Sequence, residues 1–103
     1  MAKKRKTSLG SGRIYHARGA RVAYKDAMTT FDRTIQDANK GNCWKALEKF
    51  AVANSDMGVF HRELRHAVGP GARGAMDAPR MKQQLHNKRL DAMMLLQHSC
   101  LRK

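Results

Sequence analysis

Apolar side chains recur at steps of three and four along most of the chain, and this spacing predicts helices. The first clear stretch covers residues 20–38. Its repeating apolar positions are Ala20, Tyr24, Ala27, Phe31, Ile35 and Ala38. Residues spaced in this way lie on one face of a helix that has about 3.6 residues per turn. Residues 13–18 could begin this helix earlier, but Gly19 weakens that interpretation because glycine is a poor helix former.

Residues 39–42 (Asn-Lys-Gly-Asn) predict the end of one helix and the start of the next. Gly41 suits the left-handed position that follows a helix, and Asn42 suits the N-cap of the helix that comes after it. A connection this short favours two antiparallel neighbours, a helical hairpin. The second helical region covers residues 43–68. The cluster at residues 54–56, with Gly58, could divide that region into two helices, but the continuing apolar face favours one long helix.

Residues 69–74 predict a loop, since one proline and three glycines cannot sustain a helix. Asp77 suits the N-cap of a last helix over about residues 78–101, in which Pro79 is tolerated in the first turn. No apolar–polar alternation of the strand type is present. We therefore expect an all-α fold, a small up-down bundle of three helices, or of four if the second region divides. One core is expected to contain Phe31, Ile35, Leu47, Phe50, Leu64, Leu85 and Leu96.

The N-terminal segment differs in composition from the rest of the chain. Residues 1–12 (MAKKRKTSLGSG) combine a run of basic residues with Ser, Thr and Gly and offer little to bury. Such a segment is expected to be disordered when free in solution. We accordingly divide the chain into a basic, flexible arm at residues 1–18 and a helical bundle at residues 19–103.

Positive charge dominates the composition. Lys and Arg number 21 against eight Asp and Glu, for a formal net charge of +13. Residues 1–25 contain eight of these cations and no acid. An excess of this size attracts polyanions, and basic N-terminal arms are common in nucleic-acid-binding proteins. The candidate binding residues are Lys3, Lys4, Arg5, Lys6, Arg13, Arg18, Arg21 and Lys25. The run at residues 3–6 also resembles a short nuclear-import signal.

The residues that could perform catalysis or bind metal lack the required spacing. His61 and His66 are five apart on a predicted helix, and His98 and Cys100 are two apart, so neither pair suits zinc. The glycine-rich loop is followed by Ala75 and Met76 where a phosphate-binding loop needs lysine and a hydroxyl residue. We expect no enzyme activity, no metal and no cofactor. Two cysteines do not form a disulfide framework, so we expect both thiols to be reduced.

Other features have competing interpretations. Trp44, near a helix start, is expected to be half-buried, with an interface role as the less favoured alternative. Residues 60–66 offer a basic patch that gains charge as the histidines protonate, or an ordinary solvated surface. No stretch reaches the roughly 20 apolar residues that span a bilayer, and no signal peptide is evident, so we expect a soluble, intracellular protein. The last helix could lie on an anionic membrane, but packing within the bundle explains the same apolar stripe.

Two hypotheses of function follow. The first is a non-enzymatic protein that binds nucleic acid, DNA or RNA, or a nucleoprotein assembly, through phosphate contacts with weak sequence specificity. No zinc finger, basic zipper or RNA-recognition signature is present to give stronger specificity. The alternative is a protein–protein adaptor, an inhibitor or a virion component, of a kind that phages encode, which binds an acidic protein surface. Neither hypothesis involves a small-molecule substrate.

Overall fold

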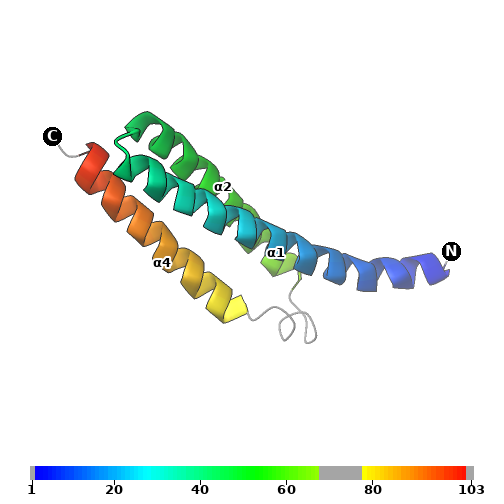
Figure 1. The fold of residues 1–103 in the computed structure, drawn as a ribbon. Helices are drawn as coiled ribbons and strands as arrows, with labels where there is room; N and C mark the ends of the chain where they lie inside the picture. The colour runs from blue at the N-terminus through cyan, green and yellow to red at the C-terminus, as the bar shows by residue number, and fades with distance from the viewer. Residues whose placement is uncertain (1, 68–77, 102–103) are drawn as a thin grey trace.

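Three helices that pack together form the structure (Figure 1). The computed structural model describes residues 2–67 and 78–101, with side chains from His16 onward. The helices are α1 (Ala2–Asn39), α2 (Cys43–His66) and α4 (Ala78–Leu96), and a π-helix, η1 (Gln97–Leu101), continues α4. No strand occurs in these two ranges, so the all-α prediction is confirmed. The loop expected at residues 69–74 and the N-cap expected at Asp77 lie outside the described residues.

The turn between α1 and α2 has the hydrogen bonds that the sequence predicts. Gly41 has a φ of 80°, which a residue with a side chain rarely adopts. The N–H of Asn42 donates to the carbonyl of Asp37 at 2.8 Å, and the N–H of Gly41 donates to that of Ala38 at 3.1 Å. This pair of bonds is the Schellman arrangement that ends many helices. Asn42 occupies the N-cap position of α2, as predicted, and its side chain makes no capping hydrogen bond.

The second helical region is one helix, α2, as favoured above. The polar cluster that could have divided it instead contacts other elements. The side-chain oxygen of Asn54 accepts a hydrogen bond of 2.8 Å from Nε of Arg89 on α4. The guanidinium of Arg89 also lies 5.8 Å from the centre of the Phe50 ring. The polar cluster is therefore compatible with a continuous helix, in which Asn54 joins α2 to α4.

The core consists of two neighbouring clusters rather than the single one predicted. The larger contains Phe31, Phe60 and Leu85, all fully buried, and a series of buried alanines along α1. The smaller contains Ala38, Ala46 and Leu96 and lies near the turn and the C-terminal end. Phe50 is partly buried and packs against both. Of the other residues predicted for the core, Leu64 is buried, and Ile35 and Leu47 are partly buried against these clusters.

The structure corrects the prediction for the N-terminal segment. The helix α1 begins at Ala2, whereas residues 1–12 were expected to be irregular. Lys, Arg, Ala and Leu are good helix formers, and extending an existing helix avoids the cost of nucleation. Gly19 does not interrupt the helix. A Cβ atom at Gly19 would lie 3.2 Å from the Glu63 carboxyl group, so glycine permits close approach of α1 and α2. The proposed flexibility of the arm and the up-down order stay predictions.

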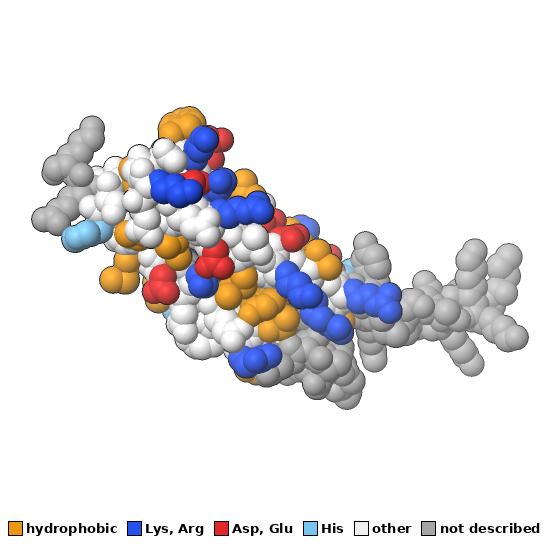
Figure 2. Space-filling view, in the orientation of Figure 1, with side chains coloured by type: hydrophobic (Ala, Val, Ile, Leu, Met, Phe, Trp, Pro, Cys, Tyr) orange, Lys and Arg blue, Asp and Glu red, His pale blue; other side chains and the backbone are white. Residues whose placement is uncertain are grey.

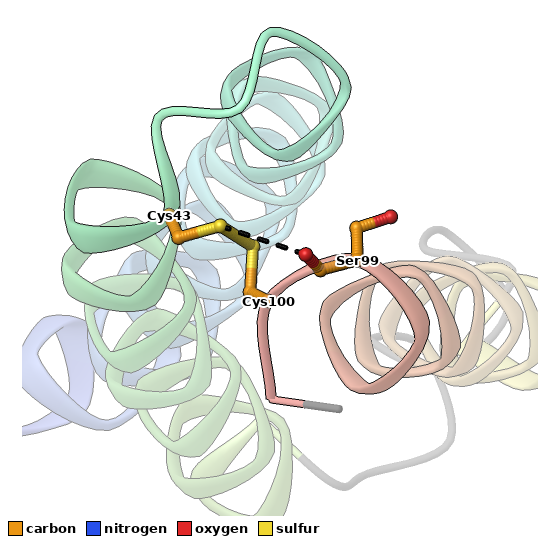
Figure 3. Close-up of a disulfide and its surroundings, with 3 residues drawn as sticks. All are labelled: Cys43, Ser99 and Cys100. Carbon is orange, nitrogen blue, oxygen red and sulfur yellow. Dashed lines mark hydrogen bonds between the residues drawn. A yellow bond between two sulfur atoms is a disulfide. The ribbon is translucent and has the colours of Figure 1, made fainter. Parts of the chain in front are cut away.

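The structure also corrects the prediction of two reduced thiols. Cys43, the first residue of α2, forms a disulfide with Cys100 in η1, and their Cα atoms are 5.5 Å apart (Figure 3). Sγ of Cys43 also lies 3.9 Å from the carbonyl oxygen of Ser99. The two cysteines are 57 residues apart in the sequence, and only the packing of α4 and η1 beside α2 brings them together. The bond fastens the C-terminal end of the described chain to the α1–α2 turn.

Across the described helices, no segment is both long enough and apolar enough to cross a membrane.

Candidate nucleic-acid interface

All eight predicted binding residues lie on α1. At 1.5 Å per residue, the backbone from Lys3 to Lys25 extends over about 33 Å. That is close to one turn of duplex DNA, about 34 Å. Lys3, Lys4, Arg5, Lys6 and Arg13 precede the first described side chain, so only their positions on the helix are known. One helix therefore carries all of the predicted cations.

The last three of these residues form a continuous exposed row. Arg18, Arg21 and Lys25 are spaced by three and four, which places them on one face of α1. All three are exposed, and none forms an ion pair with a described residue. Figure 2 shows Lys and Arg side chains over the face drawn, including the part next to the grey atoms of the N-terminal segment. This row is available to an external anion, because it is exposed and no described acid pairs with its charges.

Several of the acids, in contrast, connect the helices. Asp37 on α1 pairs with Lys49 on α2 at 2.7 Å, and Asp32 pairs with Lys88 on α4 at 2.8 Å. The hydrogen bond from Lys49 is the main reason that the pKa of Asp37 is lowered; the charges of Lys49, Lys45 and Lys40 lower it further. These carboxylates are neutralised by internal partners. They therefore oppose an approaching polyanion less than their number suggests.

A groove between α1 and α2 limits the extent of the basic face. Its volume is about 470 Å³, and its lining includes Arg18 together with Asp26, Asp56 and Glu63. Burial raises the pKa of Asp56, and the neighbouring charge of Asp26 raises it further. Since three carboxyl groups line this groove, phosphate is not expected there. Arg18 lies at this groove, whereas Arg21 and Lys25 do not line it, so the part of the row at Arg21 and Lys25 gives the more suitable surface.

The histidine patch at residues 60–66 is only partly exposed. The pKa of His61 is lowered, chiefly by burial and then by the charges of Lys82 and Arg65. His61 therefore gains its charge at a lower pH than an ordinary histidine. His66 is exposed, and its ring centre lies 5.0 Å from that of His16, which also contacts the carboxylate of Glu63. Among the described side chains, no three His, Cys, Asp or Glu are grouped in a way that could hold a metal ion.

Trp44 is the most exposed aromatic residue of the described chain, and the sequence did not predict this. Trp44 is 77% exposed, so the expectation of a half-buried side chain is wrong. The sequence contained a signal for this result. Successive helical residues are about 100° apart, so Trp44 lies about 60° from Leu47, about 100° from Cys43 and about 120° from Phe50, at the edge of the partly buried face that these three residues share. Two exposed lysines, Lys40 and Lys45, lie close to it in the chain, and they too were absent from the predicted binding set.

Comparison with known proteins places no constraint on this interpretation, because no protein-family model, curated protein or solved structure matches the chain.

Proposed function

We propose that this protein binds a polyanion, most favourably nucleic acid or a nucleoprotein assembly, through phosphate contacts with weak sequence specificity. The observation that carries the proposal is the exposed row of Arg18, Arg21 and Lys25, which forms no ion pair with a described residue and is preceded along α1 by a segment without acids. Phosphate contacts of this kind release counterions and give affinity without base recognition.

The length of the basic stretch determines the expected footprint. A helix segment of about 33 Å is about as long as one duplex turn, so it can reach the phosphates that face it over that length. If all eight residues contact phosphate, the logarithm of the association constant should fall with the logarithm of salt concentration with a slope of about −7. Fewer phosphate contacts would give a slope that is proportionally smaller in magnitude, so the measured slope gives the number of contacts.

The proposal includes no catalytic step and no cofactor. It retains an intracellular location, where nucleic acid is abundant. In reducing compartments thiols are normally kept reduced, so the Cys43–Cys100 bond would be subject to reduction there. The alternative function, an adaptor, inhibitor or phage-type virion component on an acidic protein surface, would use the same cations. It predicts selectivity for one protein rather than for nucleic acid in general.

The experiment compares two charge-matched triple variants of the full chain. One removes the row on α1 (Arg18→Ala, Arg21→Ala, Lys25→Ala). The other removes three exposed cations on α2 and α4 (Arg62→Ala, Arg65→Ala, Lys82→Ala). Affinity for a fluorescent duplex is measured by anisotropy over a range of salt concentrations. Loss of three phosphate contacts should reduce the magnitude of the salt slope by about 2.7.

The proposal predicts a smaller slope for the α1 variant and little change for the control. Equal losses in both variants would show that only net charge matters and would contradict a defined face. If the wild-type chain does not bind duplex or single-stranded nucleic acid at low salt, the proposal is wrong, and a selective acidic protein partner becomes the better hypothesis.

A further inference from the structure

An exposed aromatic ring lies on the basic corner where α1 meets α2. Trp44 occupies the first turn of α2 and is the most exposed of the large apolar residues described. Lys40 precedes Gly41 in the α1–α2 turn and Lys45 follows Trp44 in the first turn of α2, and the charges of Lys49, Lys45 and Lys40 all lower the pKa of Asp37 near the end of α1. Asp37 pairs with Lys49, while Lys40 and Lys45 are exposed and in no ion pair with a described residue. On α2, the acid nearest to Trp44 in the chain is Glu48, one helical turn later.

The backbone that leads into Trp44 is held by two features. One is the Schellman turn, with its hydrogen bonds from Gly41 and Asn42 to the end of α1. The other is the covalent bond from Cys43, the residue before Trp44, to Cys100 in η1. Burying an aromatic ring in the core would have stabilised the fold, yet this ring remains in solvent. Because the backbone beneath it is held, binding has to order only the side chain, which limits the loss of conformational freedom.

We infer that Trp44 is a stacking platform for an unpaired base of single-stranded nucleic acid, with Lys40 and Lys45 contacting the adjacent phosphates. The inference rests on the proposed function and adds a preference for unpaired strands. Two features support this ligand. A flat aromatic face accepts any base, which matches the absence of a sequence-reading motif. Lys40 and Lys45, which lie close to Trp44 in the chain and form no ion pair with a described residue, complement the phosphates that accompany every base. In a duplex the bases are stacked on one another, so only an unpaired strand can offer this contact.

The fluorescence of Trp44 provides a direct test, because it is the only tryptophan in the chain. The full-length protein is titrated at low salt with a short oligothymidylate, and in parallel with a duplex of equal length. Stacking should quench the emission with the single strand and leave it nearly unchanged with the duplex. Trp44→Ala should weaken single-strand binding by about 5- to 150-fold, the range for loss of one stacked base. Trp44→Phe should recover most of that loss.

Control variants separate stacking from charge and from folding. Trp44→Ala removes no charge, so the salt slope should not change. Lys40→Ala with Lys45→Ala should reduce the magnitude of the slope by about 1.4 on a single strand. Val52→Ala removes another exposed apolar side chain of α2 and should leave the affinity unchanged. Since Trp44 is exposed, its replacement should not alter the thermal unfolding of the protein.

The possible outcomes distinguish this inference from the proposed function. Binding to single strands with unchanged emission, and with equal affinity for Trp44→Ala, would overturn the stacking platform while the proposed function stands. An equal loss of affinity for duplex and single strand would also overturn it, because stacking on an unpaired base would not be the cause. If no nucleic acid binds and the emission responds only to an added protein partner, both proposals are wrong.

Discussion

Removal of the Cys43–Cys100 disulfide should destabilise the protein severely. The bond joins positions 57 residues apart, so it restricts most of the unfolded chain. The loop-entropy relation gives a stabilisation of about 4 kcal/mol for a loop of this length. A domain of this size has only about 5–15 kcal/mol of stability in total. The expected decrease in melting temperature is about 15–30 °C.

The assay is thermal unfolding followed by far-UV circular dichroism, with and without reductant. Cys43→Ser, Cys100→Ser and the reduced wild-type protein should unfold at similar temperatures, all well below the oxidised protein. The two single variants serve as controls for each other, since each loses the same bond through a different residue. If Cys43→Ser has the same melting temperature as the oxidised wild-type protein, then the bond does not stabilise the fold and the loop-entropy argument is refuted.

The remaining predictions concern packing and ionisation. Phe60→Ala should cost about 3–5 kcal/mol in urea unfolding because the ring is fully buried; a change below about 1 kcal/mol would contradict the placement of the larger cluster. Asp37→Asn should lower stability at neutral pH. The pKa of Asp37 is lowered from 3.8, so the difference should persist above pH 3.8 and vanish as the pH falls below it; a constant difference would disprove the link to ionisation. Asp56→Asn should raise stability at neutral pH. The pKa of Asp56 is raised from 3.8, so the ionised form is disfavoured in the fold, and the gain should disappear below pH 3.8; a loss of stability at neutral pH would refute this reasoning.

Features encoded by neighbouring residues could be predicted from the sequence. The end of α1 at Gly41 depends on a left-handed backbone position that glycine adopts readily, and the structure has it there. The continuity of α2 follows from the spacing of its apolar residues, which extends across the polar cluster at Asn54. The burial of Phe31 and Leu85 follows from the same kind of spacing. These signals are local, because each depends on residues within a few positions of one another in the sequence.

Features that depend on distant contacts could not be predicted in the same way. The disulfide forms because η1 ends beside the first turn of α2. The residues that neighbour each cysteine in the sequence give no indication that the two segments lie together. The division of the core at Phe50 likewise depends on how α4 packs. In the candidate site, the exposed face of Arg18, Arg21 and Lys25 could be predicted from residue spacing. The exposure of Trp44 was not predicted, because the apolar character of tryptophan favours burial, whereas its angular position at the edge of the buried face of α2 leaves it in solvent.

The measurement that tests the central claim most directly is the salt dependence of nucleic-acid binding when the N-terminal cluster is neutralised. Lys3, Lys4, Arg5 and Lys6 are changed to Ala, and affinity for a duplex is followed by anisotropy across salt concentrations. The proposed phosphate contacts predict steep salt dependence for the wild-type chain. In the variant they predict weaker binding and a slope smaller in magnitude by up to about four. Failure of the wild-type chain to bind at low salt would contradict the claim. A variant slope equal to that of the wild type would exclude these four residues from the interface.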